Sequence, residues 1–262
     1  MILSIDVGNT QTTLALFSLD GTCERQWRMA TAPSDTSDQL HARLHAYFQM
    51  FGLNLEDVTD VALASVVPIL TQEWERTVQN ALGCKALVID AKRDCGITVG
   101  MPNPAQAGAD RIANALSARE TYGAPVIVVD FGTASNIDVV DENGVFRGGC
   151  IMPGILLSAQ ALFSRAAKLS SVPLVVPPHT LGDSTETAVQ SGIVIGAAAQ
   201  AEGLVRRIKE ELGSPDATVV GTGGYAKVIA EATDLFDAVD PDLTTRGIYL
   251  IWRHRKDKRG EL

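Results

Sequence analysis

The sequence predicts an α/β protein made of two duplicated halves, each with a mixed β-sheet flanked by helices. An internal repeat indicates this fold. An apolar run at residues 2–5 leads into Asp6-Val7-Gly8, and about half a chain later residues 126–129 lead into Asp130-Phe131-Gly132. At both places a second apolar run and a turn follow. The repeat predicts a duplication, because its period is too long for a solenoid.

The first half contains patterns for three successive strands, followed by helices that alternate with strands. Apolar residues recur at helical spacing behind the polar starters Thr36 and Ser37, and the other runs have the length of strands. An antiparallel meander followed by helix-separated strands predicts a mixed sheet covered by helices. The expected strands are residues 2–5, 12–17, 22–31, 61–66 and 86–89, and the expected helices are 40–51 and 70–82.

The second half repeats this order. We expect the domain boundary within residues 118–124, where a helix ends and the second set of strands begins, which gives domains 1–118 and 119–262. The expected strands are residues 126–129, 137–140, 145–151, 218–220 and 236–239, and the expected helices begin after Gly154, cover 188–212, end near Ala232, and begin again at Leu243.

Composition excludes several classes of function. The chain has 22 Lys and Arg against 31 Asp and Glu, and this net charge of −9 argues against a general nucleic-acid binder. No apolar run approaches the roughly 18 residues that a membrane span needs, and the N-terminus lacks a basic region, so we expect no membrane association and a cytoplasmic protein. The cysteines are scattered, which indicates neither a zinc site nor a disulfide framework: Cys23, Cys84, Cys95 and Cys150.

The two Asp-x-Gly turns are the first candidate site. We expect Gly8 to adopt positive φ, with Asn9 and Thr10 as convergent donors and Asp6 near a hydrated magnesium ion. One such motif alone is equally typical of an ordinary turn. Because each half begins with one, the pair favours a nucleotide whose phosphates lie in a cleft between the halves.

The segment Gly108-Ala109-Asp110-Arg111 precedes apolar residues at helical spacing and so is expected to open a helix. Asp110 could accept the proton of an attacking hydroxyl, and Arg111 could neutralise an anionic group. Taken alone, Asp110 is better explained by helix capping, and a helix N-terminus should lower its pKa. The turn at residues 221–224 could admit an adenosine or merely join a strand to a helix, and Thr185 could be a hydroxyl donor or an N-cap.

Together these motifs resemble the type III pantothenate kinases, a branch of the acetate and sugar kinase, Hsp70 and actin superfamily. The resemblance covers essentially the whole chain. It implies two duplicated ribonuclease H-like domains of the actin-like ATPase type with an active-site cleft between them. The motifs that carry it are residues 6–12, Asn103-Pro104 with 108–111, residues 130–134, 149–154 and 221–224.

The resemblance also implies roles for individual residues. Asp110 would be the proton acceptor, Asp130 would bind a monovalent cation, K⁺ or NH₄⁺, and Mg²⁺ would accompany the nucleotide near Asp6. The family works as a homodimer with substrate near the subunit interface, and makes 4′-phosphopantothenate at the first step of coenzyme A synthesis. The residues implied to contact ATP are Asp6, Val7, Gly8, Asn9, Thr10, Gln11, Thr12, Thr13 and Thr133, and those implied to contact pantothenate are Met101, Gly108, Ala109, Asp110, Arg111 and Thr185.

The sequence departs from the family pattern at two places. Met101 stands where the family usually has a tyrosine, and Ser135 and Asn136 stand where it tends to have threonines. Neither change removes a proposed catalytic group. Two other interpretations stay open: a kinase of the same superfamily for another small hydroxylated substrate, and a non-catalytic nucleotide-binding regulator.

Overall fold

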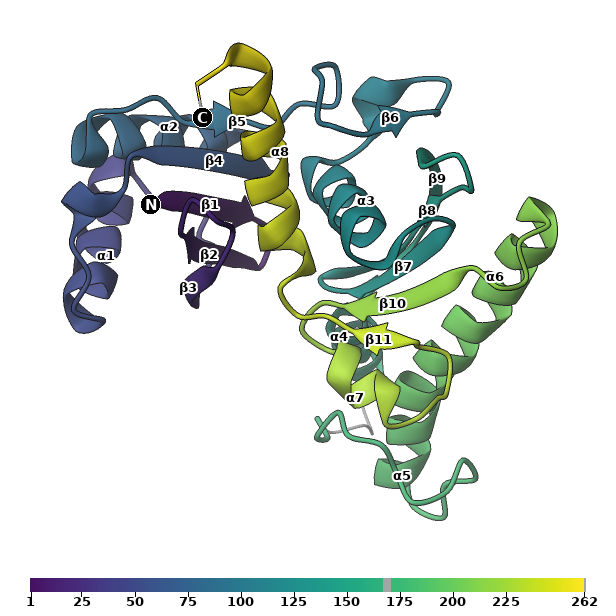
Figure 1. Ribbon diagram of the computed structural model, residues 1–262. Coiled ribbons are helices and arrows are strands. Elements are labelled where there is room, and N and C mark those ends of the chain that lie inside the picture. Colours follow the sequence, from purple (N-terminus) through teal and green to yellow (C-terminus); the bar gives the residue numbers. More distant parts are fainter. Residues whose placement is uncertain (167–170, 262) are drawn as a thin grey trace. The chain divides into compact units, whose positions relative to one another are not determined.

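The computed structural model describes residues 1–166 and 171–261 (Figure 1). The chain forms two compact units, the first made of Met1–Ser117 together with the chain from Leu243 onward, and the second of Ala118–Asp242. The division falls inside helix α3 (Ala109–Tyr122), so one helix belongs partly to each unit.

The first unit is built on a five-stranded sheet with the order β3-β2-β1-β4-β5, in which β1 pairs antiparallel with β2 and parallel with β4. This mixed sheet confirms the meander and the parallel strands predicted from the sequence. Besides α3, its elements are β1 (Ile2–Val7), β2 (Gln11–Phe17), β3 (Cys23–Ala30), α1 (Ser37–Met50), η1 (Leu55–Asp57), β4 (Asp60–Ser65), α2 (Pro68–Leu82), β5 (Leu87–Val88), β6 (Thr98–Val99), η2 (Pro104–Gln106) and α8 (Leu243–Arg259).

Successive side chains of β1 point to opposite faces of the first sheet. Leu3, Ile5 and Val7 belong to a core cluster that also contains buried side chains of α1 and α2. Because successive side chains of a strand point to opposite faces, Asp6 lies on the other face of the sheet. The core therefore fixes which way the carboxylate at the end of β1 points.

The last helix corrects the predicted domain organisation. The sequence assigned all of residues 119–262 to the second domain, but α8 packs on β1, β2 and β4 of the first unit. Tyr249 stacks on Phe17 with ring centroids 5.0 Å apart, and its hydroxyl donates to the Leu19 carbonyl at 2.8 Å. Figure 1 shows the yellow helix lying against the purple and blue strands. Periodicity alone cannot reveal such a return, because it reports local structure only.

The second unit repeats the strand order of the first. Its strands run β11-β10-β7-β8-β9, with β7 and β8 antiparallel and β7 and β10 parallel. The match to β5-β4-β1-β2-β3 confirms the duplicated α/β fold. The elements are β7 (Val126–Phe131), β8 (Ala134–Val140), β9 (Val145–Pro153), α4 (Ile155–Arg165), α5 (Thr185–Gln190), η3 (Ser191–Ile195), α6 (Gly196–Leu212), β10 (Thr218–Thr222), α7 (Ala226–Ala230) and β11 (Ala238–Val239).

The helix expected over residues 188–212 begins earlier, at Thr185, and contains the π-helical turn η3. The stretch Thr185–Leu212 has 28 residues and a mean hydropathy of 1.2 in its most apolar window, and by length and composition alone it could cross a membrane. However, Val194, Ala198 and Val205 belong to the core cluster that contains Ile127 and Val129 of β7. Such packing is expected of a helix that covers a sheet.

A close helix crossing in the first unit gives a stability prediction. A Cβ at Gly247 of α8 would collide with the backbone of Ala113 in α3, whereas a Cβ at Gly203 of α6 would meet nothing within 4 Å. We expect Gly247→Ala to lower the free energy of unfolding by about 1–3 kcal/mol through overpacking. Gly203→Ala is the matched control and should raise it by up to about 1 kcal/mol, because alanine favours the helix. Urea denaturation measures both, and equal stability of the two variants would contradict the expectation.

Candidate functional site

The first candidate turn joins β1 to β2. The Gly8 amide donates to the Gln11 carbonyl at 3.1 Å, which closes the turn, and Asn9, Thr10 and Gln11 are exposed. Gly8 does not adopt positive φ, contrary to the expectation from sequence. A Cβ there would lie 2.9 Å from the Gln11 oxygen. Glycine is therefore favoured by the closeness of the turn and not by a left-handed backbone.

The residues on either side of this turn alternate between the face of the sheet that carries Asp6 and the buried core. Thr13 lies directly opposite Asp6 in the antiparallel pair, so their side chains share one face of the sheet. Thr12 points to the other face, where it is 1% exposed and its hydroxyl lies 2.9 Å from that of Thr31. Val7 is fully buried in the core. Of the segment predicted to contact ATP, the side chains of Val7 and Thr12 thus stabilise the fold.

The second candidate turn joins β7 to β8, and the backbone of a glycine from another segment packs against it. The Gly132 amide donates to the Ala134 carbonyl at 3.1 Å, and Thr133 is exposed. Gly154, the N-cap of α4, approaches so closely that a Cβ there would collide with the Gly132 and Thr133 carbonyls. The α4 N-terminus, which carries a partial positive charge, therefore lies against this turn.

The glycine-rich turn after β10 lies on the other side of Asp130. Gly223 has a φ of +91°, and a Cβ there would collide with the Asp130 carboxylate and the Phe131 backbone. A Cβ on Gly221 would touch the Phe236 ring at 3.2 Å. Packing thus explains both glycines, whereas Gly224 is exposed with nothing near it. Of these three glycines, Gly224 alone keeps the predicted role of bare backbone that a ligand could approach.

Asp110 lies in the first turn of α3, as the sequence predicts. Its Oδ1 accepts a hydrogen bond of 2.8 Å from the Arg111 amide, and a Cβ on Gly108 would collide with that same oxygen. Desolvation by burial raises the pKa of Asp110 above its ordinary value of 3.8, against the lowering effects of the Arg111 amide and charge. The expected lowering of this pKa is wrong, because loss of solvent outweighs the helix N-terminus.

The other residues implied to contact pantothenate lie in three segments. Arg111 is only 8% exposed, and Ala109 beside it is also buried. Met101 is half-buried in the irregular segment between β6 and η2. Thr185 is not the N-cap of α5, since Ser184 caps that helix by accepting from the Thr187 amide.

Thr185 lines a cavity of about 430 Å³ between α4 and the helices that follow. The π-helical turn η3 supplies part of its wall, and π-helical turns occur frequently at functional sites. The cavity size falls in the range of small-molecule pockets. Its other lining residues are Leu162, Ala188, Val189, Gly192 and Ile193.

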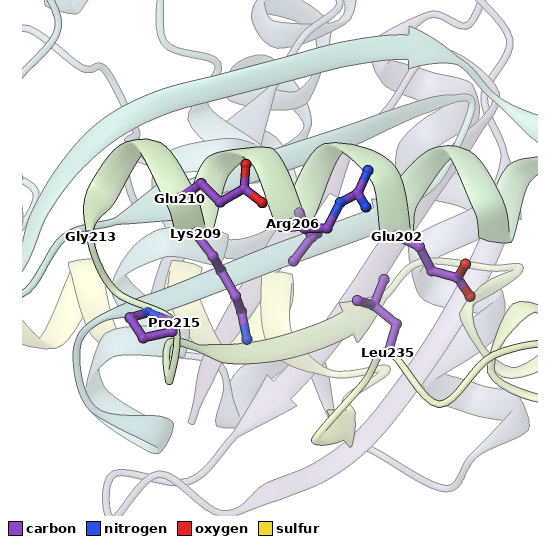
Figure 2. A pocket seen from close by; sticks show the side chains of 8 residues that line it. Glu202, Arg206, Lys209, Glu210, Gly213, Pro215 and Leu235 are labelled. Atoms are coloured by element: carbon purple, nitrogen blue, oxygen red, sulfur yellow. The ribbon is translucent and has the colours of Figure 1, made fainter.

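A second cavity, of about 470 Å³, lies beside α6 and contains none of the predicted site residues. Figure 2 shows Leu235 pointing from the β10–β11 connection toward α6, with Lys209 beside Pro215. Val205, which also lines this cavity, is buried. Glu202 accepts a hydrogen bond from the Thr233 hydroxyl. Its rim carries cations and carboxylates together, so its charge favours no ligand of one sign.

The described residues contain no group of three or more His, Cys, Asp or Glu side chains that could hold a metal ion. Asp6 and Asp110 belong to the first unit and Asp130 to the second. A cation at Asp6 or Asp130 would therefore depend on neutral oxygen ligands, water or phosphate oxygens. Mg²⁺ bound with a nucleotide commonly uses one or two carboxylates in this way, so the donor set fits it.

Comparison with known proteins decides the family. Residues 2–207 match the family model described as type III pantothenate kinase. The chain is 40% identical over 258 residues to the type III pantothenate kinase of Agathobacter rectalis, covering 98% of this chain and 99% of that protein. The chain belongs to the type III pantothenate kinase family.

A second curated relative agrees with this assignment, and a solved structure shares the fold. The type III pantothenate kinase of Thermomicrobium roseum is 42% identical over 248 residues, which cover 95% of each chain. The solved structure of the activator of 2-hydroxyisocaproyl-CoA dehydratase from Clostridium difficile, with bound ADPNP, shares the fold. It aligns with a TM-score of 0.59 at 13% identity, covering 100% of this chain and 97% of that one.

Sequence reasoning missed one buried carboxylate in this pantothenate kinase family member. Asp138 is fully buried on β8, on the same face as Asn136 and opposite Val128. A charged residue inside the apolar run 137–140 was the available signal, because acids are almost never fully buried without partners.

The raised pKa of Asp110 predicts a pH-dependent stability difference. The folded chain holds this proton more tightly than the unfolded chain, so ionisation destabilises the fold once the pH exceeds 3.8. We expect Asp110→Asn to raise the melting temperature at neutral pH, with the gain vanishing below pH 3.8. Calorimetry over that range tests this, and exposed Asp216→Asn is the control that should show no gain. A gain independent of pH would contradict the assignment.

Proposed function

We propose that the protein transfers the γ-phosphoryl group of ATP to the primary hydroxyl of pantothenate, forming 4′-phosphopantothenate in the first step of coenzyme A synthesis. Family membership supports the reaction. The observation that carries the proposal is Asp110, a half-buried carboxylate with a raised pKa at the start of α3. We place the reaction in the cytoplasm, where the free cysteines would stay reduced.

Asp110 is suited to receive the proton of the attacking hydroxyl. Its proton affinity is higher than that of an exposed aspartate, which brings it closer to the working pH of a general base. The loose transition state of phosphoryl transfer makes positioning of the hydroxyl more important than basicity. The Arg111 amide fixes one carboxylate oxygen at 2.8 Å, and so orients the group that would hold the alcohol.

The two turns supply the nucleotide contacts in this proposal. Asn9 and Thr10 in the first unit and Thr133 in the second are exposed beside the aspartates that end β1 and β7. Mg²⁺ bound with ATP would neutralise phosphate charge, with Asp6 as its nearest protein carboxylate. Met101, Gly108 and Arg111 would contact pantothenate from the segment around the α3 N-terminus, and Thr185 from the cavity beside α4.

We also assign a monovalent cation, K⁺ or NH₄⁺, to Asp130. Asp130 is half-buried and lies between the glycine backbone of residue 223 and the β7–β8 turn. A single carboxylate among neutral oxygens balances one positive charge, and this chemistry suits a monovalent ion. The cation would offset phosphate charge beside the nucleotide.

Replacement of Asp110 tests the proposed reaction. We expect Asp110→Asn to lower kcat for pantothenate-dependent ADP formation by roughly 10² to 10⁴, with ATP binding retained, because the amide cannot take the proton. Asp216→Asn is the matched control and should keep wild-type turnover. Wild-type turnover by Asp110→Asn would remove Asp110 from the mechanism.

The same assay separates the two rival functions. ADP release with a sugar or acetate but not with pantothenate would indicate another substrate. ATP binding without any turnover, with K⁺ present, would indicate a nucleotide-binding regulator.

We further propose that two copies of the chain pair through the surface of α4. Leu156, Leu157 and Leu162 are 38%, 48% and 37% exposed there, so this one helix carries three partly exposed leucines. Exposed large apolar side chains gathered in one region favour an interaction site. Thr185 and Leu162 line one cavity, so a partner on α4 would bring the subunit interface next to this implied substrate contact.

A charge placed on α4 tests the pairing. We expect Leu157→Glu to convert a dimer into a monomer of 27.8 kDa, because an unpaired charge in an apolar interface is strongly unfavourable. Ile69→Glu on α2, where the side chain is 61% exposed, is the control and should stay dimeric. Size-exclusion chromatography with light scattering reads the mass directly. A wild-type monomer, or a dimeric Leu157→Glu variant, would refute this surface.

A further inference from the structure

One amide oxygen next to Asp130 lacks a hydrogen-bond partner. Asn136 on β8 lies directly opposite Asp130 on β7, so the two side chains share one face of the sheet. The Asn136 Oδ1 is buried and accepts no hydrogen bond from any residue in the described ranges 1–166 and 171–261. A buried acceptor without a donor is unfavourable, and in a native protein it calls for an ion, a water or a ligand.

The neighbours of Asn136 do not supply a donor. Thr222 lies on the other side of Asp130 and donates its hydroxyl to the Asp240 carbonyl at 2.7 Å. Ile151, opposite Asn136 on β9, is apolar and 67% exposed. The Asn136 amide oxygen and the Asp130 carboxylate are therefore cross-strand neighbours, and the side of Asn136 toward β9 is open to solvent. Two neighbouring oxygens that both carry negative charge attract a cation.

In both units the residue opposite the aspartate bears a side-chain oxygen. This residue is Asn136 opposite Asp130 in the second unit and Thr13 opposite Asp6 in the first. In the second unit the asparagine side chain reaches one atom further than a threonine and offers a carbonyl oxygen, a stronger neutral ligand for hard cations than a hydroxyl.

We propose that Asn136 Oδ1 is a second protein ligand of the cation at Asp130, and that it sets a preference for a monovalent over a divalent ion. The inference rests on the cation assigned to Asp130 in the proposed function. One carboxylate and one neutral oxygen carry a single negative charge, which matches K⁺ or NH₄⁺. Asp138, a fully buried carboxylate two residues further along the same face, has interactions of its own.

Cation-dependent melting of the full chain tests this without any enzymatic readout. An ion that binds only the folded state raises the melting temperature with its concentration. With choline chloride holding the ionic strength constant, wild type should melt at higher temperature as KCl replaces choline. In Asn136→Ala the KCl concentration for half of this effect should rise on the order of tenfold, as expected for the loss of one good ligand.

Two further variants make the test specific. Asn143→Ala, the same substitution at an exposed position in the turn between β8 and β9, should keep the wild-type KCl dependence. Asn136→Asp has nearly the same shape, so it should fold, and its second carboxylate should shift the stabilisation from KCl toward MgCl₂. This gain cannot arise from simple damage to the strand.

The outcomes separate the two claims. If KCl stabilises wild type and Asn136→Ala equally, Asn136 is not a ligand, while a cation at Asp130 stands. If KCl changes neither the melting temperature nor the ADP formation of wild type, the cation itself is refuted and this inference falls with it. An Asn136→Asp variant that keeps the wild-type preference for KCl over MgCl₂ also overturns the inference.

Discussion

Close backbone contact around Asp130 is the constraint on which the second unit depends. Gly223 presses against the carboxylate and the Phe131 backbone, and Gly154 presses against the carbonyls of the β7–β8 turn. No side chain fits at either position, so β10, the α4 N-terminus and the turn converge without intervening atoms. Because interiors are packed as densely as crystals, such contacts fix positions to within tenths of an ångström. A side chain at residue 223 would therefore collide with the Asp130 carboxylate.

The same strand order places chemistry differently in the two units. In both, an aspartate is the next-to-last residue of a central strand, and the next strand returns antiparallel to it. The first unit adds α3, whose first turn carries the half-buried Asp110, and α8, which packs on its sheet. The second unit adds the cavity at Thr185 and the partly exposed leucines of α4. A duplicated scaffold has therefore specialised through its helices, while the strands keep the two acids at equivalent ends.

Local patterns predicted the strands, the turns and the duplication, because alternation and turn residues act over a few positions. The predictions were wrong where contacts with distant segments determine a residue's environment. The burial of Asp110 reverses the shift expected from its helix terminus, and only tertiary packing could reveal that. Gly8 is needed for proximity to the Gln11 oxygen, not for positive φ, and Thr12 is paired with Thr31, nineteen residues away. The motif resemblance named candidate residues but could not say which of them face solvent.

Because α8 packs on the first sheet, the two units are completed at different times during synthesis. The first unit combines the N-terminal segment with the chain from Leu243 onward, whereas the second is one continuous segment. As the ribosome extends the chain, the segment of the second unit is complete before the last helix of the first has been made. Until α8 has been made, the face of β1 and β2 that packs against it lacks this helix.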